Sequence, residues 1–342
     1  ANVLEKANDN LIDLTFNIQE SEKFYIEKIN ILGNNITEES VIRNSLIIDE
    51  GDGFNELLHN RSINNIKSLN FFSNIENEVI NGTSKNQKII NIDLEEKPTG
   101  EITAGAGVGT EGGTLAFGVK ENNFLGKGIG LDTNLRLTTS GVKGNFDVHN
   151  PNYKDSNRSL TLSIESSVTD NLKDYGYKSN KTGFSIGSGY EFYDNFFINT
   201  GISTYVESLK TDTTASANLK KQKGNYFDTF FNYTFDYDQR NQKFQTTDGY
   251  RSVFTQNVPF ISDSYTLNNK YNFIKYNEWL SENIASLSFH IASSNSLNGN
   301  NIKLSERLFL PSRKLRGFES GKIGPKDVSD FIGGNYSMAI NA

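Results

Sequence analysis

The sequence has no cysteine, one methionine and only five prolines among its 342 residues. Without cysteine, a disulfide-stapled scaffold, a cysteine-ligated zinc site and thiol catalysis are excluded. No stretch approaches the roughly 20 consecutive apolar residues of a transmembrane helix, so a helical membrane protein is excluded as well. Basic residues are also too few for a general nucleic-acid binder, because 34 Lys and Arg face 41 Asp and Glu.

Aromatic residues and glycine are abundant instead. The chain contains 24 Phe, 15 Tyr and 29 Gly, which is too aromatic for a disordered protein. Its length allows about two domains. A soluble all-β protein and a transmembrane β-barrel both fit this composition. The mean hydropathy of −0.52 does not separate them, because a barrel strand exposes only every second residue to lipid.

Both ends of the chain suggest a piece of a longer protein. It begins at Ala1 without an initiator or a signal peptide, and its single methionine is Met338. The segment Leu11–Ile18 has the pattern of one strand without a partner. We therefore expect the first residues to be the end of a preceding unit, and both termini to be cut.

A small α+β unit is predicted next. Tyr25–Leu32 alternates as a strand, and Thr37 is the expected N-cap of a first helix. Asn55–Leu69 carries apolar residues at helical spacing, and Ile75–Ile80 and Lys88–Leu94 alternate as two further strands. The predicted order is β-α-α-β-β.

From residue 100 onward the pattern changes to a two-residue alternation. In one example Phe231, Tyr233 and Phe235 alternate with polar residues, which places apolar groups on one face of a strand. The 243 positions up to the end predict about twelve strands, each near the roughly 9–11 residues of a tilted membrane strand. Aromatic residues crowd strand ends, as at Tyr190–Tyr193, which suits interfacial girdles. The pattern favours an all-β antiparallel transmembrane barrel, with a soluble β-protein as the alternative.

Two sequence motifs of enzymes occur in the wrong context. Gly107–Gly112 matches G-x-G-x-x-G, but Thr114–Lys120, which follows it, has the pattern of a strand and not of the helix that a dinucleotide site needs. Gly183–Gly187 matches G-x-S-x-G, but its flanks also alternate as strands, whereas a nucleophile elbow needs a strand-to-helix turn. A β-rich hydrolase that uses Ser185 stays an alternative, and no enzyme is expected.

Metal binding is not expected either. The three histidines, His59, His149 and His290, lie in separate segments without ligand spacing. We expect no metal and no cofactor.

Two stretches in the second half are more specific. The first is a strand, a charged turn and a strand that restarts at a glycine, with Asp238, Arg240 and Gly249 as its marked residues. The second is the tip of a long connection, and long connections are usually functional or disordered. An arginine at such a tip needs a carboxylate partner if it is tucked into the barrel. This tip consists of Leu315, Arg316, Gly317 and Phe318.

These motifs together resemble the Omp85 superfamily of outer-membrane assembly and secretion proteins. Residues 21–97 resemble a POTRA domain, and residues 95–100 resemble its junction with the barrel. Residues 123–128 (NFLGKG) are similar to the hairpin between the first barrel strands. Residues 238–249 resemble the D-x-R…PT-x-G segment with Thr in place of Pro, and residues 315–318 (LRGF) resemble the VRGF tip. The motifs occur in the order of the family.

The resemblance implies a division of the chain into three parts. Residues 1–20 would be the end of a preceding POTRA domain, residues 21–97 a POTRA domain, and residues 98–342 the barrel. The barrel of the family has about sixteen strands, of which this chain would hold about twelve.

The resemblance is strongest to the BamA family of barrel-assembly factors in Gram-negative bacteria, which implies a function. Such a protein lies in the outer membrane, in contact with its lipid, with POTRA domains in the periplasm. Its partners would be unfolded barrel clients and the accessory lipoproteins of a BAM-like complex. No nucleic acid would bind. POTRA strands would take up a client strand at their edges, and the expected residues there are Ile75, Val79, Ile90 and Ile92.

The first barrel strand would be a weak seam, because glycine weakens strand pairing. Such a seam can part and template a client strand. Its small residues are Ala104, Gly105, Ala106, Gly107 and Gly109. In the long connection, Arg316 would lock the loop against an acidic wall, with Phe318 packed beside it and the acidic partners on strands beyond Ala342. A secretion pore of the same superfamily, TamA-like or of the two-partner type, is the alternative function.

Overall fold

The computed structural model describes most of the chain. The described residues are 2–8, 11–17, 22–109, 112–139, 141–172, 176–243, 245–280, 283–311, 314–318, 321–328 and 330–342. The chain divides into two compact units, one of residues 1–99 with 125–127 and one of residues 100–124 with 128–342. No helix in the described residues is long and apolar enough to cross a membrane.

The first element is a hairpin. β1 (Asn2–Asn8) pairs with β2 (Leu11–Asn17) in antiparallel register from Asn2 opposite Asn17 to Asn8 opposite Leu11. The strand predicted at Leu11 is therefore present, but the expectation that it lacks a partner is wrong. Its partner is the segment just before it, whose short pattern was not recognised as a strand.

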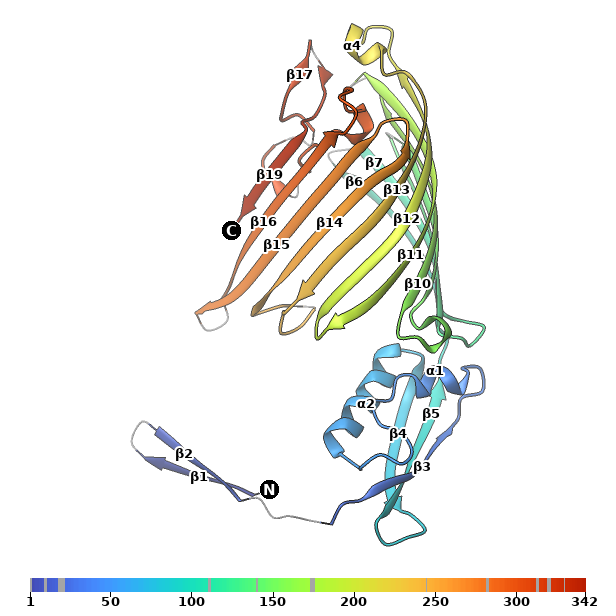
Figure 1. The fold of residues 1–342 in the computed structure, drawn as a ribbon, viewed down its shortest axis with the longest axis vertical. Coiled ribbons are helices and arrows are strands. Elements are labelled where there is room, and N and C mark those ends of the chain that lie inside the picture. The colour runs from blue at the N-terminus through green and yellow to red at the C-terminus, as the bar shows by residue number, and fades with distance from the viewer. Residues whose placement is uncertain are drawn as a thin grey trace. The chain divides into compact units, whose positions relative to one another are not determined.

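The α+β unit has the predicted element order (Figure 1). β3 (Tyr25–Leu32), α1 (Glu39–Arg43), α2 (Glu56–Leu69), β4 (Phe72–Asn81) and β5 (Gln87–Glu96) follow one another along the chain. The sheet order is β3-β5-β4, in which β5 is parallel to β3 and antiparallel to β4. This arrangement leaves β5 in the centre of the sheet.

The core of this unit is built largely from isoleucine. Ile29 of β3, Ile63 and Ile66 of α2, and Ile90 and Ile92 of β5 are all buried in one cluster. Ile90 and Ile92 are 0% and 1% exposed on a strand that is paired on both sides, so neither can receive a partner at an edge. The expected edge role of these two residues is wrong, because the alternation that marks a strand does not tell a central strand from an edge strand.

Helix α2 has a conventional N-cap, whereas α1 does not. The Asn55 side chain accepts hydrogen bonds from the backbone N–H groups of Leu57 and Leu58, which satisfies free donors of the first turn of α2. The N-cap position of α1 is Glu38, without a side-chain cap. The predicted cap Thr37 is instead 2% exposed.

The second unit is one curved antiparallel sheet of twelve strands, as the alternation predicted (Figure 1). The strands are β6 (Gly100–Gly109), β7 (Gly112–Phe124), β8 (Ile129–Thr138), β9 (Gly141–Asn150), β10 (Ser159–Asn171), β11 (Tyr177–Tyr193), β12 (Phe196–Thr211), β13 (Gly224–Asp238), β14 (Gly249–Ser262), β15 (Thr266–Leu280), β16 (Asn283–Ser296) and β19 (Tyr336–Asn341). Each of these twelve strands pairs with the next one in this series, so β6 and β19 form the two ends of the sheet.

Short elements lie in the connections. They are η1 (Tyr153–Asp155), α4 (Ala217–Lys220), η2 (Leu304–Glu306), β17 (Lys326–Asp327) and β18 (Asp330–Phe331). The connection between β16 and β19, residues 297–335, is the longest and contains η2, β17 and β18.

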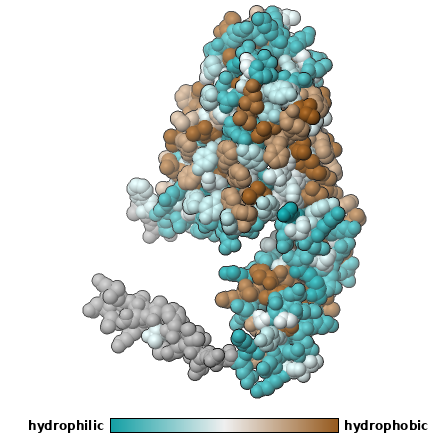
Figure 2. Space-filling model, in the orientation of Figure 1, coloured by the Kyte–Doolittle hydropathy of each residue, from teal (hydrophilic) through white to brown (hydrophobic). Residues whose placement is uncertain are grey.

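The two faces of the large sheet differ in chemistry. The face that packs against the β16–β19 connection, here the inner face, carries polar residues such as Glu207 and Asp228. The opposite, outer face exposes large apolar side chains, and hydrophobic residues spread over the sheet in Figure 2. Phe227, Phe231 and Phe235 of β13 leave 37–43% of their surface exposed on this face. A sheet with an apolar outside and a polar inside fits a membrane barrel.

Aromatic rings gather where β11, β12, β13 and β14 end. Tyr193 stacks on Phe196 with 6.3 Å between ring centroids. Phe196 contacts Tyr237 edge-on at 6.0 Å, and Tyr237 contacts Tyr250 at 5.8 Å. Such a band is typical of the interfacial girdle of a barrel.

Candidate functional site

Strand β6 is the first candidate site, because it is an end strand of the sheet that the described residues form. It pairs with β7 from Gly100 opposite Glu121 to Gly109 opposite Gly112, and no other strand of the described residues pairs with it. Ala104 and Ala106 lie opposite the large side chains of Phe117 and Leu115. The predicted seam residues therefore share one edge strand.

The glycines of β6 leave empty space rather than filling a tight contact. A Cβ added to Gly105 or Gly107 would meet no atom within 4 Å. Neither glycine has the positive φ that would demand this residue type. The main physical effect of these two glycines is therefore a strand with little side-chain packing.

The Asp238 motif forms a compact turn between β13 and β14. Arg240 grips the Asp238 carboxylate with two hydrogen bonds, from Nε and from an Nη atom, both of 2.7 Å. Gly249 has φ +96°, and a Cβ there would lie 2.2 Å from the Gln239 carbonyl oxygen. The structure thus brings Asp238, Arg240 and Gly249 together, and only glycine fits at the last position.

The LRGF tip lies in the β16–β19 connection. Arg316 lines a cavity of about 690 Å³ together with Arg251, Asn272 and Lys314. Its side chain is exposed and forms no ion pair with the described residues. Phe318 is 58% exposed among the described residues, and its packing beside Arg316 stays a prediction.

A different residue fixes the connection to the inner face. Lys303 is 4% exposed, and its Nζ lies 2.8 Å from Glu207 Oε2 of β12 and 2.6 Å from Asp228 Oδ2 of β13. Glu306, in the same connection, is 3.6 Å away, and the Tyr226 ring lies 4.9 Å from the ammonium. One cation of the connection is therefore held by carboxylates from two strands.

The charged groups of this cluster change one another's pKa values. Burial alone would lower the pKa of Lys303, but the carboxylates of Glu306 and Glu207 and the hydrogen bond to Asp228 outweigh it and raise that pKa. Burial raises the pKa of Glu306, and the charge of Lys303 offsets this only in part. Lys303 is thus held in its charged form at any physiological pH.

Sequence reasoning missed Lys303 because no local pattern marks it. Its partner Asp228 is 75 positions away, and the pairing depends on how β13 and the connection meet in space. A lysine in a long polar connection is ordinarily a solvated residue.

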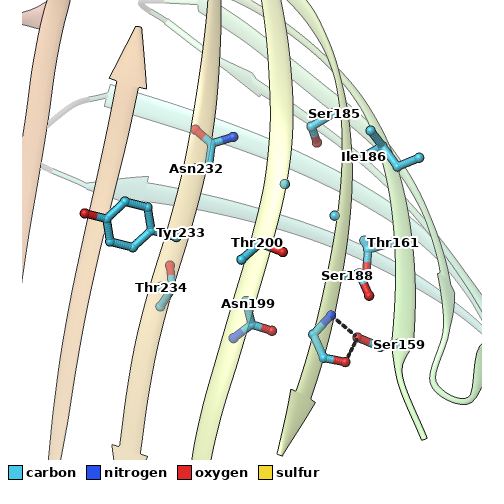
Figure 3. Close-up of a pocket in the computed structure, with 13 residues that line it drawn as sticks. Ser159, Thr161, Ser185, Ile186, Ser188, Asn199, Thr200, Asn232, Tyr233 and Thr234 are labelled. Carbon is cyan, nitrogen blue, oxygen red and sulfur yellow. Dashed lines mark hydrogen bonds between the residues drawn. The ribbon is translucent and has the colours of Figure 1, made fainter. Parts of the chain in front are cut away.

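The G-x-S-x-G serine lies in a polar hollow of the inner face without catalytic geometry (Figure 3). Ser185 sits in the middle of β11, opposite Ser163 and Ser203 on the neighbouring strands. The hollow measures about 240 Å³, and in it the Ser159 hydroxyl bonds both the N–H and the C=O of Gly189. The strand-to-helix turn of a nucleophile elbow is absent around Ser185.

The histidines make separate polar contacts. His59 bonds Asn77 at 2.9 Å, His149 bonds Thr161 at 2.9 Å, and His290 bonds Asn272 at 2.7 Å. Within the described ranges no group of His, Asp and Glu side chains could hold a metal ion.

Comparison with known families matches both units. A model of the Omp85 superfamily domain matches residues 123–342, and a POTRA model, described as a surface antigen variable number repeat, matches residues 24–97. The chain belongs to the Omp85 superfamily. The Omp85 match starts at Asn123, the first residue of the NFLGKG turn, and includes the Asp238 turn and the LRGF tip.

Several proteins similar to this Omp85 chain are outer membrane protein assembly factors. BamA of Neorickettsia risticii is 25% identical over 95% of this chain and 44% of its own length. BamA of Neisseria meningitidis is 23% identical over 64% of this chain and 24% of its own length. A SAM50-like protein of Schizosaccharomyces pombe is 24% identical over 74% of this chain and 55% of its own. The chain thus spans about half or less of these relatives.

Solved structures agree on the fold. BamA from Haemophilus ducreyi lacking POTRA domains 1–3 matches with a TM-score of 0.78 and 21% identity, over 99% of this chain and 71% of the other. CdiB from Acinetobacter baumannii matches with a TM-score of 0.53 and 11% identity, over 87% of this chain and 58% of the other.

Proposed function

We propose that the chain is part of an outer membrane protein assembly factor, which folds β-barrel proteins and inserts them into the outer membrane. The assembly-factor names of its relatives support this role. The observation that carries it is the loose packing of β6, where a Cβ added to Gly105 or Gly107 would meet no atom within 4 Å, in a sheet with a mainly apolar outer face. This role needs no covalent chemistry and no cofactor, because assembly would proceed by the pairing of strands.

The edge of β6 would act as a template. Backbone N–H and C=O groups of an unpaired strand pair readily with another chain. In lipid they must find partners, because hydrocarbon offers none. The small residues at 104–107 weaken the packing that would otherwise hold a closing strand. A client strand would therefore add to β6, and its later release would be easy.

The α+β unit would bind clients or partners by the edge of β4. On the other side of the sheet, the backbone of β3 is already bonded by the segment at residues 50–54: Ile26 N–H donates to the Asp52 carbonyl at 2.8 Å, and Gly51 N–H to the Ile26 carbonyl at 2.7 Å. β4 has only β5 as a neighbour among the described strands. Ile75 and Val79, half-buried on β4, would align this edge for strand addition.

The location of the protein and its partners follow from the same proposal. The sheet would lie in the outer membrane among its lipids, with the POTRA unit, residues 21–97, in the periplasm. The hairpin β1–β2 would end a preceding POTRA domain, since the β4–β5 pair ends this one in the same way. Unfolded barrel proteins would be the clients, accessory lipoproteins of a BAM-like complex the partners, and Arg316 would find its carboxylate beyond residue 342.

A secretion pore of the same superfamily is the second candidate. The similarity of the sheet to CdiB from Acinetobacter baumannii and from Escherichia coli, with TM-scores of 0.53 and 0.54, favours it. The higher TM-score of 0.78 to a BamA structure is a likeness of fold and leaves the activity to experiment.

Depletion of the full-length protein in its native host separates the two functions. For an assembly factor, unrelated outer-membrane barrels should fall together while unfolded barrels accumulate in the periplasm, as measured by quantitative proteomics of both fractions. For a secretion pore, one exported protein should disappear while the barrels persist. Unchanged barrels and unchanged secretion would contradict both proposals.

A further inference from the structure

A continuous row of polar side chains crosses the mainly apolar outer face of the large sheet. Its members lie directly opposite one another on β13, β14, β15, β16 and β19, with one additional residue two positions along β16. The row, named the outer-face ladder here, consists of Tyr233, Gln256, Asn269, Ser293, Asn295 and Tyr336.

Hydrogen bonds connect the whole ladder. Tyr233 donates its hydroxyl to Gln256 Oε1 at 2.5 Å, and the Gln256 amide donates to Asn269 Oδ1. Asn269 Nδ2 donates to Ser293 Oγ at 3.1 Å. On the far side, Asn295 Nδ2 donates to the same Ser293 Oγ at 3.2 Å. The Tyr336 hydroxyl completes the row by donating to Asn295 Oδ1 at 2.8 Å.

The groups left over in the ladder are donors. A side-chain amide has two N–H donors and one carbonyl oxygen, and a serine hydroxyl has one donor. The oxygens of Gln256, Asn269, Asn295 and Ser293 each accept at least one of these bonds. Each of the three amides uses one N–H within the ladder, and the Ser293 O–H is not used there. The three remaining amide N–H groups and the Ser293 O–H therefore suit a ligand that offers acceptor oxygens.

The position of the ladder on the sheet indicates which kind of molecule supplies those oxygens. Tyr336 is the first residue of β19, and Ser293 lies three residues before the end of β16. Gln256 lies in the middle of β14. The ladder thus begins at strand ends and runs inward across a face that also exposes Phe231 and Met338. Free donors among apolar side chains are costly in hydrocarbon unless they are bonded.

We propose that the outer-face ladder is a lipid site, which binds the ester carbonyl and phosphate oxygens of a glycerophospholipid. This proposal rests on the proposed placement of the sheet in a membrane. The lipid head would sit at the Tyr336 end, where the strands finish, and its glycerol ester groups would reach the amides of Asn269 and Gln256. The site would hold one lipid in a fixed place on a face whose exposed side chains are mainly apolar.

The test compares lipid retention by the full chain and by a ladder variant. Both are reconstituted in nanodiscs with diester or diether phosphatidylcholine, extracted in mild detergent, and their bound lipid is counted by native mass spectrometry. Gln256→Met with Asn269→Leu removes the two central amides and keeps side-chain size. We expect about tenfold less bound diester lipid, the change that follows from the loss of two ordinary hydrogen bonds.

A matched control lies on the same face outside the ladder. The hydroxyls of Thr204 and Thr229 are 3.2 Å apart on β12 and β13, and Thr204→Val with Thr229→Val should keep wild-type retention. If the wild-type chain retains diester lipid but not diether lipid, the ladder binds the ester carbonyls. If it retains both lipids equally, the ladder binds the phosphate.

The contradicting outcomes are distinct. A ladder variant that inserts and still holds as much lipid as the wild type overturns the ladder proposal alone. A wild-type chain that fails to insert into bilayers, as judged by its circular dichroism and protease protection, overturns the membrane placement and the ladder proposal with it.

Discussion

At the scale of single residues, Lys303 is the position where one substitution should matter most for the long connection. Lys303→Met would leave Glu207 and Asp228 as buried carboxylates without their cation, and breaking a buried pair in this way costs about 3–5 kcal/mol. We expect the connection to leave the inner face and to be cut faster in limited proteolysis, with a lower temperature of unfolding for the sheet.

The control for this substitution is Arg316, a second cation in the same connection. Arg316 is exposed and has no ion pair among the described residues, so Arg316→Met should change the stability of this chain by less than about 0.5 kcal/mol. If the Arg316 variant were cut faster than the wild type while the Lys303 variant were cut at the wild-type rate, the tip, and not Lys303, would hold the connection.

Glu96 is the residue at which the α+β unit should respond to pH. Its carboxylate accepts the backbone N–H groups of Asn35, Ile36 and Thr37 at 3.0, 2.8 and 2.7 Å. Burial is the largest single influence and raises its pKa, but the hydrogen bonds from Thr37, Ile36 and Asn35 together outweigh it and hold the pKa below its ordinary value of 4.5.

The sign of the pH effect follows from that lowered pKa. The ionised carboxylate stabilises the fold above about pH 4.5, and this contribution is lost as the pH falls through the lower, folded pKa. Hydrogen exchange should therefore show that protection of the three amides decreases in acid after correction for the intrinsic rate. Glu96→Gln should flatten this dependence, and a wild type whose protection is independent of acid would refute the role of the carboxylate.

At the scale of elements, the looseness of β6 can be tested by adding side chains to it. Gly105→Val and Gly107→Val fit without a clash and replace glycine by a strong strand former. We expect the sheet to gain about 0.5–1 kcal/mol in stability while assembly of barrel proteins by the full-length protein slows. The measurements are the unfolding temperature and the rate of client folding in proteoliposomes.

A glycine in the interior of the sheet provides the control for β6. Gly144 of β9 is also open, with its nearest neighbour Leu135 at 3.7 Å from an added Cβ. Gly144→Val should give a similar gain in stability without slowing assembly. Equal slowing by both substitutions would mean that the edge position of β6 has no special part in the reaction.

The elements themselves were largely predictable, because a two-residue alternation is a local property of the sequence. The twelve strands of the large sheet and the order of the α+β unit are confirmed for that reason. The failure of the N-cap prediction at Thr37 could not be foreseen, since that residue is buried and its N–H donates to Glu96 of β5, about sixty positions away. Ile90 and Ile92 were misplaced at an edge because alternation does not encode the order of strands in a sheet.

At the scale of the whole molecule, the candidate site depends on contacts between distant parts, and these were the least predictable. Lys303 meets β12 and β13 only after the sheet has curved around the connection. The outer-face ladder needs five strands in one register before its side chains bond. The family motifs located the connection and the seam strand, but the residues that carry the charges and the hydrogen bonds became visible only in three dimensions.

The absence of cysteine makes a direct test of the whole assembly reaction possible, because any introduced thiol is the only one in the chain. Ile102→Cys places a thiol on the unpaired edge strand β6, and Ile164→Cys places one on β10, which is paired on both sides. Both side chains are exposed, by 83% and 52%, so they differ chiefly in whether a strand can add beside them.

A barrel client with one cysteine in an edge strand should form a disulfide with the Ile102 variant during assembly and not with the Ile164 variant. The bond requires Cα atoms within about 7 Å, the distance of neighbouring strands, and random collisions in the membrane would label both variants alike. Equal capture at the two positions would therefore exclude β6 as the template. Capture at β6 alone would place the client strand beside the end strand of the sheet that the described residues form.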